Sequence, residues 1–333
     1  MSFTDNIKFC LGTWSWGAPQ TGSTAINNWA GTGNTEEKNK ECWKAAIKEA
    51  CMFFDTAEVY NNGRSEELIG EFINSDREDK NSRNNILQGD KEVFIATKFI
   101  PLPYRVFQSS LKSALQKSLQ RLKMDKVQLY QVHGPAFSWF RSIETWAHGL
   151  AEVKKLNLTD ELGVSNYNSD QVKRTINVLE TYGYTLASNQ IEYSLLHTYP
   201  EKSGLIETCK KLNVKILAYS PLAMGRLCGK IRSKEDLDKL TGNRKFGVVS
   251  WEILEKLNNT MDEIAAKKSC SHSQLALAWV IAKGCIPIAG AKSEQQLIDN
   301  WKATEIHLTK EEVEQLDAVS YEGQTSFWQG SSE

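Results

Sequence analysis

Four residues of this chain could carry out acid–base chemistry at one site: Asp55, Tyr60, Lys98 and His133. Asp55, Lys98 and His133 each end a short apolar run, and each would lose hydration there at a cost unless it had a partner. Asp55 can neutralise Lys98, and Tyr60 follows closely enough for its hydroxyl to turn back toward the lysine. A phenol has an ordinary pKa of about 10, which a neighbouring ammonium lowers. These residue types therefore predict a proton donor that works near neutral pH.

The elements that must position these residues are short apolar runs, each followed by a segment with helical periodicity. Eight strands are predicted: the run before Gly12 and Thr13, and then 52–55, 93–98, 127–133, 161–166, 186–190, 214–220 and 286–290. Helices are predicted between the strands at about 35–50, 65–74, 104–123, 139–156, 169–181, 200–212 and 293–302, and in a long region at 249–283. A final helix at about 309–320 is predicted to pack outside the barrel. Eight β/α repeats, without a GxGxxG after the first strand, predict a (β/α)₈ TIM barrel of the α/β class rather than an open sheet.

The bulk composition fits this architecture and excludes several classes of protein. The 333 residues lie within the usual length of such a barrel, so residues 1–333 are predicted to form a single domain. The net charge of −1 provides no general attraction to nucleic acid or to anionic membranes. No apolar run approaches the roughly 18 residues of a membrane span, and the N-terminus is polar, so we expect a cytoplasmic location. The seven cysteines lack metal-ligand spacing, which predicts reduced, packed thiols and no metal site.

Local signals mark several boundaries. Ser65, followed by two glutamates, is predicted to cap one helix, and Ser293 with Gln296 has the spacing of a capping box for another. The polar segment 74–91 is predicted to be a surface insertion, because it lacks an apolar face. The glycine-containing segment 221–249 is predicted to be a long loop on the catalytic side of the barrel.

The sequence around the candidate residues resembles the successive signatures of the aldo-keto reductase superfamily. The matching segments are 54–60 (FDTAEVY), 96–98 (ATK), 131–133 (QVH), 163–167 (GVSNY), 188–190 (SNQ), 218–222 (AYSPL) and 286–290 (IPIAG). They occur in order and span nearly the whole chain. The resemblance implies an enzyme that reduces aldehydes or ketones with NADPH as its cofactor, and its nearest branch is the plant-type and microbial one that includes pyridoxal reductases.

The resemblance also implies a role for particular residues. Tyr60 would be the general acid, Lys98 and Asp55 would tune it, and His133 would orient the carbonyl. Other positions would bind the cofactor: Gly12, Thr13 and Trp14 at the first strand; Ser165, Asn166 and Gln190 at the carboxamide; Tyr219 stacked on the nicotinamide; Ser220, Leu222, Gly225 and Lys230 at the pyrophosphate; and Gly290, Lys292, Gln296, Asp299 and Asn300 at the adenosine. A helix N-terminus attracts phosphate, and Lys292 beside it could pair with the 2′-phosphate, which favours NADPH over NADH.

The predicted substrate pocket is aromatic, and other functions stay open. Side chains that follow strand ends or lie in the first loop could line it: Trp14, Trp29, Phe99, Tyr104, Phe137 and Trp139. They suggest an aromatic or apolar carbonyl substrate, with pyridoxal as one candidate, although each could equally pack in the core. One alternative is a nucleotide-binding sensor, like the channel beta subunits that resemble this family. Another is an aldolase with Lys98 as its Schiff-base lysine. The resemblance implies a monomer, and a closed barrel has no free strand edge that would force association.

Overall fold

Eight parallel strands close into a barrel in the computed structural model, which describes residues 7–17, 35–78, 93–135, 142–240 and 249–323. The strands are β1 (Cys10–Gly12), β2 (Phe53–Asp55), β3 (Phe94–Phe99), β4 (Val127–Val132), β5 (Thr159–Ser165), β6 (Ser188–Glu192), β7 (Lys215–Tyr219) and β8 (Ile286–Ala289). Each strand pairs with the next, and β8 pairs back with β1, where Leu11 lies opposite Ala289. The predicted (β/α)₈ TIM barrel and its eight strands are confirmed.

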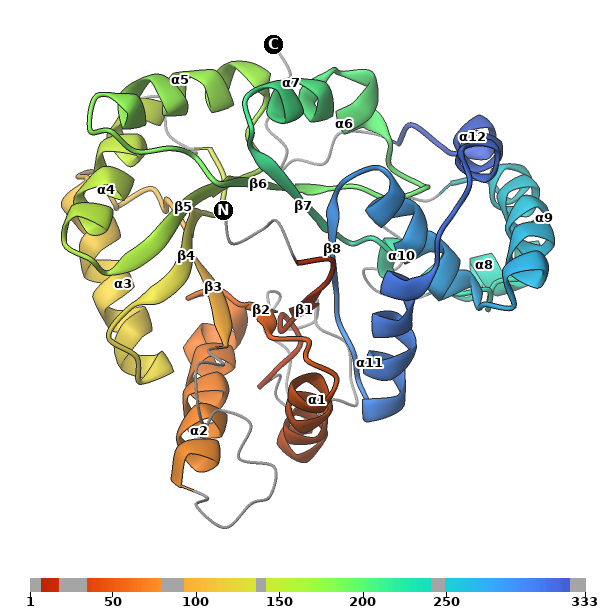
Figure 1. Ribbon diagram of the computed structural model, residues 1–333, viewed down its shortest axis with the longest axis horizontal. Coiled ribbons are helices and arrows are strands. Elements are labelled where there is room, and N and C mark those ends of the chain that lie inside the picture. The colour runs from red at the N-terminus through yellow and green to blue at the C-terminus, as the bar shows by residue number, and fades with distance from the viewer. Residues whose placement is uncertain (1–6, 18–34, 79–92, 136–141, 241–248, 324–333) are drawn as a thin grey trace.

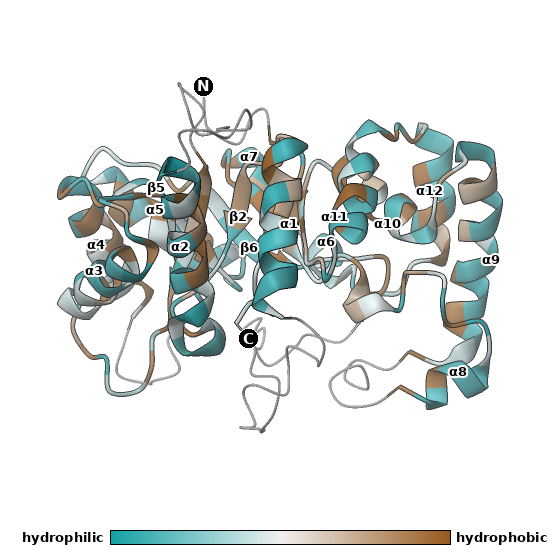
Figure 2. Cartoon of the chain, turned by 90° about the horizontal axis from the view of Figure 1, so that it is seen from below, coloured by the Kyte–Doolittle hydropathy of each residue, from teal (hydrophilic) through white to brown (hydrophobic). Residues whose placement is uncertain are grey.

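Helices surround the barrel (Figure 1). They are α1 (Glu36–Lys48), α2 (Arg64–Glu78), α3 (Ser109–Leu122), α4 (Ile143–Lys155), α5 (Ser169–Glu180), α6 (Tyr199–Lys202), α7 (Leu205–Lys211), α8 (Lys234–Asp238), α9 (Trp251–Lys268), α10 (His272–Ala282), α11 (Glu294–Trp301) and α12 (Lys310–Val319). Figure 1 shows α9 and α12 side by side outside α10, so the final helix packs outside as predicted. Figure 2 shows the outer face of α1 as mainly hydrophilic. Among the described residues no helix is both long and apolar enough to cross a bilayer.

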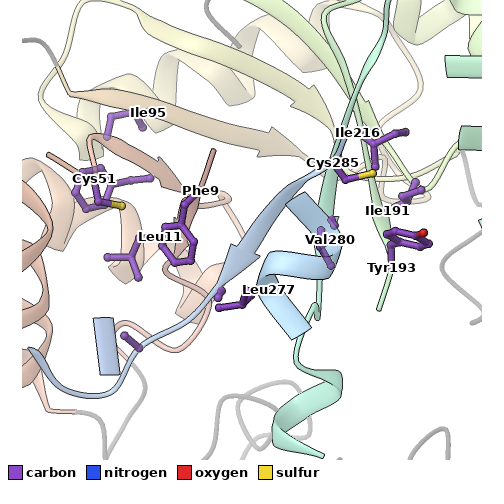
Figure 3. Close-up of a cluster of buried hydrophobic side chains, with 14 of the residues drawn as sticks. Phe9, Leu11, Cys51, Ile95, Ile191, Tyr193, Ile216, Leu277, Val280 and Cys285 are labelled. Carbon is purple, nitrogen blue, oxygen red and sulfur yellow. The ribbon is translucent and has the colours of Figure 1, made fainter. Parts of the chain in front are cut away.

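Two separate apolar layers hold the barrel. The larger lies between strands and helices; Figure 3 shows part of it, where Leu277 and Val280 of α10 approach the strands and Tyr193 lies nearby. Tyr193 also stacks on Trp279, with ring centroids 5.0 Å apart. The smaller layer fills the barrel interior with the side chains of Cys10, Phe53, Ala96, Leu129, Leu217, Ile286 and Ile288. All seven cysteines are free and five are buried, as predicted.

Strand alternation explains where the polar side chains go. Successive side chains point to opposite faces of a strand, so residues two apart share a face. Phe53 and Ala96 belong to the interior apolar layer, and the next interior positions toward the carboxyl end are Asp55 and Lys98. Gln131 follows Leu129 in the same way on β4. The barrel interior is therefore apolar toward the amino ends of the strands and polar at their carboxyl ends, where the chemistry is expected.

The structure corrects the predicted cap at Ser65. Helix α2 begins at Arg64, so Ser65 lies inside its first turn. The Ser65 hydroxyl donates to the Thr13 carbonyl oxygen at 3.0 Å and also contacts the Thr13 hydroxyl at 2.8 Å. Ser293 does cap α11, since its Oγ accepts from Gln296 N at 3.3 Å. The Gln296 side chain accepts from Lys292 N instead of completing the capping box.

Other boundaries move because backbone turns interrupt the predicted segments. The helix predicted at 200–212 is two helices, α6 and α7, separated by Gly204 at φ +76°. The region 249–283 also divides into two, with Ser269 at φ +52° after α9. The helix predicted from 104 starts at Ser109, and the one predicted from 139 starts at Ile143. Each expected helix thus exists; most predicted ends were too generous, whereas the helix predicted at 65–74 was too short.

The two predicted irregular segments are partly helical. Helix α2 continues to Glu78, so the predicted insertion does not begin at 74, and its remainder lies outside the described residues. The loop predicted at 221–249 contains a 3₁₀ turn at Ala223–Gly225 and the short helix α8. Residues 241–248 of that loop also lie outside the described part of the chain.

A glycine sets how closely α2 approaches α3. A methyl group on Gly70 would lie 2.8 Å from the backbone carbon of Leu122, which cannot move aside as a side chain can. We expect Gly70→Ala to lower the free energy of unfolding by about 1–3 kcal/mol, despite the better helix propensity of alanine. Urea unfolding measures this change, with Ser75→Ala at an exposed position of α2 as the control. Equal midpoints for the two variants would contradict the close packing.

Candidate active site

The carboxyl ends of the strands bring the four predicted catalytic residues together around Lys98. The Lys98 side chain is fully buried on β3. Its Nζ donates to Asp55 Oδ1 at 2.6 Å, to the Thr56 carbonyl oxygen at 2.7 Å and to the Tyr60 hydroxyl at 3.1 Å. An ammonium has three protons to donate, and these three contacts account for all of them.

The charge of Lys98 is retained in spite of its burial. Burial lowers the pKa of an ammonium, but the Asp55 carboxylate and the Tyr60 hydroxyl outweigh that effect and raise the pKa of Lys98 above its usual value. A Schiff-base lysine must be a neutral amine to attack a carbonyl. The geometry therefore disfavours the aldolase hypothesis.

Tyr60 lies on a tight turn directly after β2. The turn at Tyr60–Gly63 places Asn61 and Asn62 in left-handed backbone conformations, which asparagine tolerates better than most residues. The Asn61 side-chain amide donates to the backbone oxygens of Trp14 and Trp16, at 3.1 and 2.7 Å. These bonds fix the β2 loop, and with it Tyr60, against the β1 loop.

The net effect of the surroundings on the pKa of the Tyr60 phenol differs from the prediction. Burial raises its pKa, and although the Lys98 charge lowers it, as expected, the overall pKa of Tyr60 is raised. The expectation of a lowered pKa was wrong because the sequence showed the ammonium but not the loss of hydration. Tyr60 consequently holds its proton firmly at neutral pH, with a cationic donor 3.1 Å from the hydroxyl.

His133 is a neutral ring beside this phenol. Its ring centroid lies 5.8 Å from that of Tyr60, with the planes at 74°. Burial and the nearby Lys98 charge lower the pKa of His133 to about 3. Its Nδ1 is buried without a hydrogen-bond partner among the described residues. A neutral imidazole can donate a hydrogen bond from one nitrogen, so His133 could orient an oxygen that approaches Tyr60.

Asp55 is held by two amide side chains, one of which the sequence reasoning did not select. Asp55 Oδ2 accepts from Gln190 Nε2 at 2.8 Å and, more weakly, from Gln131 Nε2 at 3.4 Å. Gly163 leaves room for this arrangement, because a methyl group there would lie 2.8 Å from Gln131 Cγ. The available signal was an inward-facing polar residue between Leu129 and His133 in an otherwise apolar strand.

A second cluster of amide and hydroxyl groups adjoins the first. Asn166, at φ +61° directly after β5, donates through Nδ2 to the His133 backbone oxygen and to Ser165 Oγ, each at 3.1 Å. The Tyr219 hydroxyl donates to Asn166 Oδ1 at 2.9 Å, and Ser165 Oγ donates to the Gln190 backbone oxygen at 2.9 Å. The structure thus brings Ser165, Asn166, Gln190 and Tyr219 together next to His133.

The other residues that the resemblance assigns to the cofactor lie around the β1, β7 and β8 ends of the barrel. Thr13 is buried, and its hydroxyl donates to the Asp55 carbonyl oxygen at 2.9 Å, whereas Trp14 is exposed. Asn300 Nδ2 donates to the Gly290 carbonyl oxygen at 3.3 Å and so ties α11 to the turn after β8. Residues with partly or fully exposed positions are Gly12, Ser220, Leu222, Gly225, Lys230, Gly290, Lys292, Gln296 and Asp299.

The predicted aromatic pocket is only partly supported. Phe99 is fully buried and packs against Trp146, with ring centroids 5.0 Å apart, so it belongs to the core. Tyr104 is 74% exposed and Trp14 is 38% exposed. Trp29, Phe137 and Trp139 lie outside the described residues.

The fold and site together define a (β/α)₈ barrel with a buried lysine hydrogen-bonded to a tyrosine hydroxyl at its carboxyl end. A family model described as the aldo/keto reductase family matches residues 8–321. The chain belongs to the aldo/keto reductase family and is an oxidoreductase with a fold and family that support carbonyl reduction.

Individual relatives agree with this assignment. A chloroplastic pyridoxal reductase from Arabidopsis thaliana is 32% identical over 329 residues, covering 96% of this chain and 84% of that protein. The aldo-keto reductase yakc [NADP(+)] from Schizosaccharomyces pombe is 28% identical, covering 85% and 82%. The crystal structure of Tm1743, a thermostable aldo-keto reductase, with the inhibitor epalrestat superposes with a TM-score of 0.72 at 29% identity, covering 94% of this chain and 95% of that one.

The neutral state of His133 makes stability depend on pH. Its pKa is about 3 in the folded protein, against about 6.5 in an unfolded chain, so between these values the unfolded state binds more protons. Folding is therefore weakened as pH falls through this window, and His133→Gln removes the penalty. As pH falls from about 7.5 to about 5, we expect the free energy of unfolding of the variant to rise by up to about 2 kcal/mol relative to that of wild type.

Urea unfolding at the two pH values measures this gain. His307→Gln, at an exposed position, is the control and should change little. A His133→Gln variant whose stability relative to wild type is the same at both values would show that His133 is not held neutral.

Proposed function

We propose that this protein reduces aldehydes or ketones to alcohols with NADPH, and that Tyr60 donates the proton to the carbonyl oxygen. The observation that carries the proposal is the fully buried Lys98, whose Nζ lies 3.1 Å from the Tyr60 hydroxyl. As the hydroxyl loses its proton, the adjacent ammonium stabilises the developing phenolate. Lys98 thus assists Tyr60 at the moment of transfer, while burial keeps the phenol protonated beforehand.

The arrangement of the other residues supports a defined path for the substrate oxygen. His133 is neutral and its ring lies edge-on to Tyr60, so it can orient the same oxygen without competing as a base. Asp55 balances the Lys98 charge and is itself held by Gln190. Lys98 is charged and His133 is neutral before the substrate arrives, so the groups around Tyr60 are preorganised for its proton transfer.

The residues present fit a nicotinamide dinucleotide. Gln190 directs its Nε2 to Asp55, and its Oε1 accepts no hydrogen bond from the described residues, so that oxygen is suited to a carboxamide N–H. Gly225 has φ +91°. A methyl group at this position would contact no atom within 4 Å, so the backbone here borders open space. NADPH, when bound, supplies the hydride. Ser165, Asn166, Gln190 and Tyr219 would hold its nicotinamide end.

The preference for NADPH rests on Lys292 and the start of α11. Ser293 caps this helix and Gln296 bonds Lys292 N, so the turn is fixed in place before any nucleotide arrives. A lysine at a helix N-terminus is a suitable partner for the 2′-phosphate. The relative named with NADP(+) supports the same choice.

We infer that the substrates are aromatic or apolar carbonyl compounds and that pyridoxal is the first to test. The relative named pyridoxal reductase supports this choice, and the exposed Trp14 and Tyr104 follow strand ends at the same side of the barrel. A monomer is proposed because the closed barrel leaves no strand edge for pairing. A cytoplasmic location stays a prediction.

Replacement of Tyr60 tests the central claim. Tyr60→Phe removes the proton and leaves the ring, so kcat should fall at least about 100-fold. The dissociation constant for NADPH, measured by fluorescence titration, should stay within about twofold of wild type. A loss of binding together with activity would contradict the role of Tyr60. Tight NADPH binding by wild type without turnover of any aldehyde would favour the sensor hypothesis.

Lys292→Met tests cofactor selection. Loss of a charged partner should weaken NADPH binding by about 10- to 100-fold and leave NADH binding unchanged. Titration of the variant with both nucleotides measures this difference, and Lys302→Met at an exposed position just after α11 is the control. Equal losses for the two nucleotides would mean that Lys292 does not contact the 2′-phosphate.

A further inference from the structure

An ion pair joins the loop that carries Tyr60 to the loop that follows β3. The Arg105 guanidinium donates to both carboxylate oxygens of Glu58: Nη2 donates to Oε2 at 3.0 Å, and Nη1 donates to Oε1. The Glu58 side chain is 8% exposed and that of Arg105 is 19% exposed. This bidentate geometry is the most specific that arginine makes with a carboxylate, and here it links residues far apart in the sequence.

The same pair binds the backbone of Ile100 on both sides. Glu58 Oε1 accepts from Ile100 N at 2.8 Å, and Arg105 Nη1 donates to the Ile100 carbonyl oxygen at 2.9 Å. The Arg105 guanidinium also lies 4.8 Å above the Phe99 ring. The last register pair of β2 with β3 is Asp55 with Ala96, so Glu58 extends the contact between these two strands beyond the sheet.

The positions of Tyr60 and Lys98, the two partners of the site's central hydrogen bond, therefore both depend on the Glu58–Arg105 ion pair. Tyr60 N donates to the Ala57 oxygen at 3.0 Å, so Glu58 lies within the turn that orients Tyr60. Lys98 lies on β3 just before Phe99 and Ile100, and Glu58 N approaches the Lys98 carbonyl oxygen at 3.4 Å. A shift of this turn would change the distance from the Tyr60 hydroxyl to Lys98 Nζ, and proton transfer is sensitive to displacements of about 1 Å.

We propose that Glu58 and Arg105 are positioning residues, which hold the Tyr60 hydroxyl at hydrogen-bonding distance from Lys98 for proton donation. The proposal rests on the proposed function of Tyr60. A stabilising role alone is a weaker explanation, because a largely buried ion pair is often replaceable by apolar residues without loss of stability. The pair instead sits where two loops must keep a fixed separation.

The first experiment uses Glu58→Gln, Arg105→Met, Arg105→Lys and the Glu58→Gln/Arg105→Met double variant of the full chain. Single-turnover oxidation of NADPH by an aldehyde that wild type reduces gives the rate of the chemical step, and fluorescence titration gives NADPH affinity. We expect about a 10-fold or larger loss in rate for Glu58→Gln and Arg105→Met, with unchanged affinity. The double variant should be no worse than the poorer single one, since the two residues act as a unit. Arg105→Lys should recover part of the loss.

The second experiment measures the pKa of Tyr60 directly, in the absence of cofactor and turnover. Tyrosine labelled with ¹³C at Cζ is titrated by NMR, and the Tyr60 signal is assigned by its absence in Tyr60→Phe. A looser contact removes part of the lowering influence of Lys98, so the pKa of Tyr60 should rise further in the variants. Because the protonated phenol is the active acid, the alkaline limb of the rate profile should move to higher pH as well.

A second bidentate arginine–glutamate pair, more exposed than the first, provides the control. Arg174 donates to both carboxylate oxygens of Glu144, at 2.8 and 3.0 Å, and joins α5 to α4 on the outside of the barrel. Glu144→Gln and Arg174→Met should change thermal stability only, without moving the rate or the Tyr60 titration.

The outcomes separate the two proposals. Wild-type rates and an unshifted Tyr60 titration in Glu58→Gln and Arg105→Met would overturn the positioning role. Absence of aldehyde turnover in wild type would overturn the proposed function instead, and the titration would still decide the positioning role. If Arg105→Met does not fold, Glu58→Gln and Arg105→Lys are judged by the same two measurements.

Discussion

The buried positive charge of Lys98 is the constraint on which the rest of the site depends. A bare ammonium in a barrel interior would carry a large desolvation cost, so every neighbour within hydrogen-bonding distance must accept a hydrogen bond from it. Asp55, the Thr56 carbonyl and the Tyr60 hydroxyl do so. Asp55 in turn needs donors for its second oxygen, and the buried amide of Gln190 meets that need from across the barrel.

The barrel can accommodate such a group because its interior is built in levels. Strand alternation places the side chains of Phe53, Ala96 and Leu129 in the barrel interior, toward the amino ends of the strands, where they form an apolar layer. The positions two residues further on, Asp55 and Lys98 among them, reach the carboxyl end on neighbouring strands. Stability comes mainly from the apolar layers, inside the barrel and beneath the helices, and the polar end is left for chemistry.

The sequence predicted the features that depend on local pattern and missed those that depend on distant partners. Eight apolar runs ending in polar residues were enough for the strands and for the positions of Asp55, Lys98 and His133. The cap at Ser65 failed because its hydroxyl is taken by Thr13, which lies in another loop. The pairing of Glu58 with Arg105 joins residues 47 positions apart, and no local pattern indicates it. The direction of the Tyr60 pKa required knowing its burial as well as its charged neighbour.

The protonation states of the site carry an implication for the direction of reaction. Asp55 and Lys98 cancel in charge, His133 is neutral, and burial keeps the Tyr60 phenol protonated. A carbonyl acceptor needs an acid, whereas oxidation of an alcohol needs a phenolate as base. With the pKa of Tyr60 raised, the acid form is the resting state at neutral pH, and the base form is populated only in alkali. On the proposed function, the resting enzyme therefore already holds the proton that reduction consumes, and the ratio of oxidised to reduced cofactor, together with pH, sets the net direction.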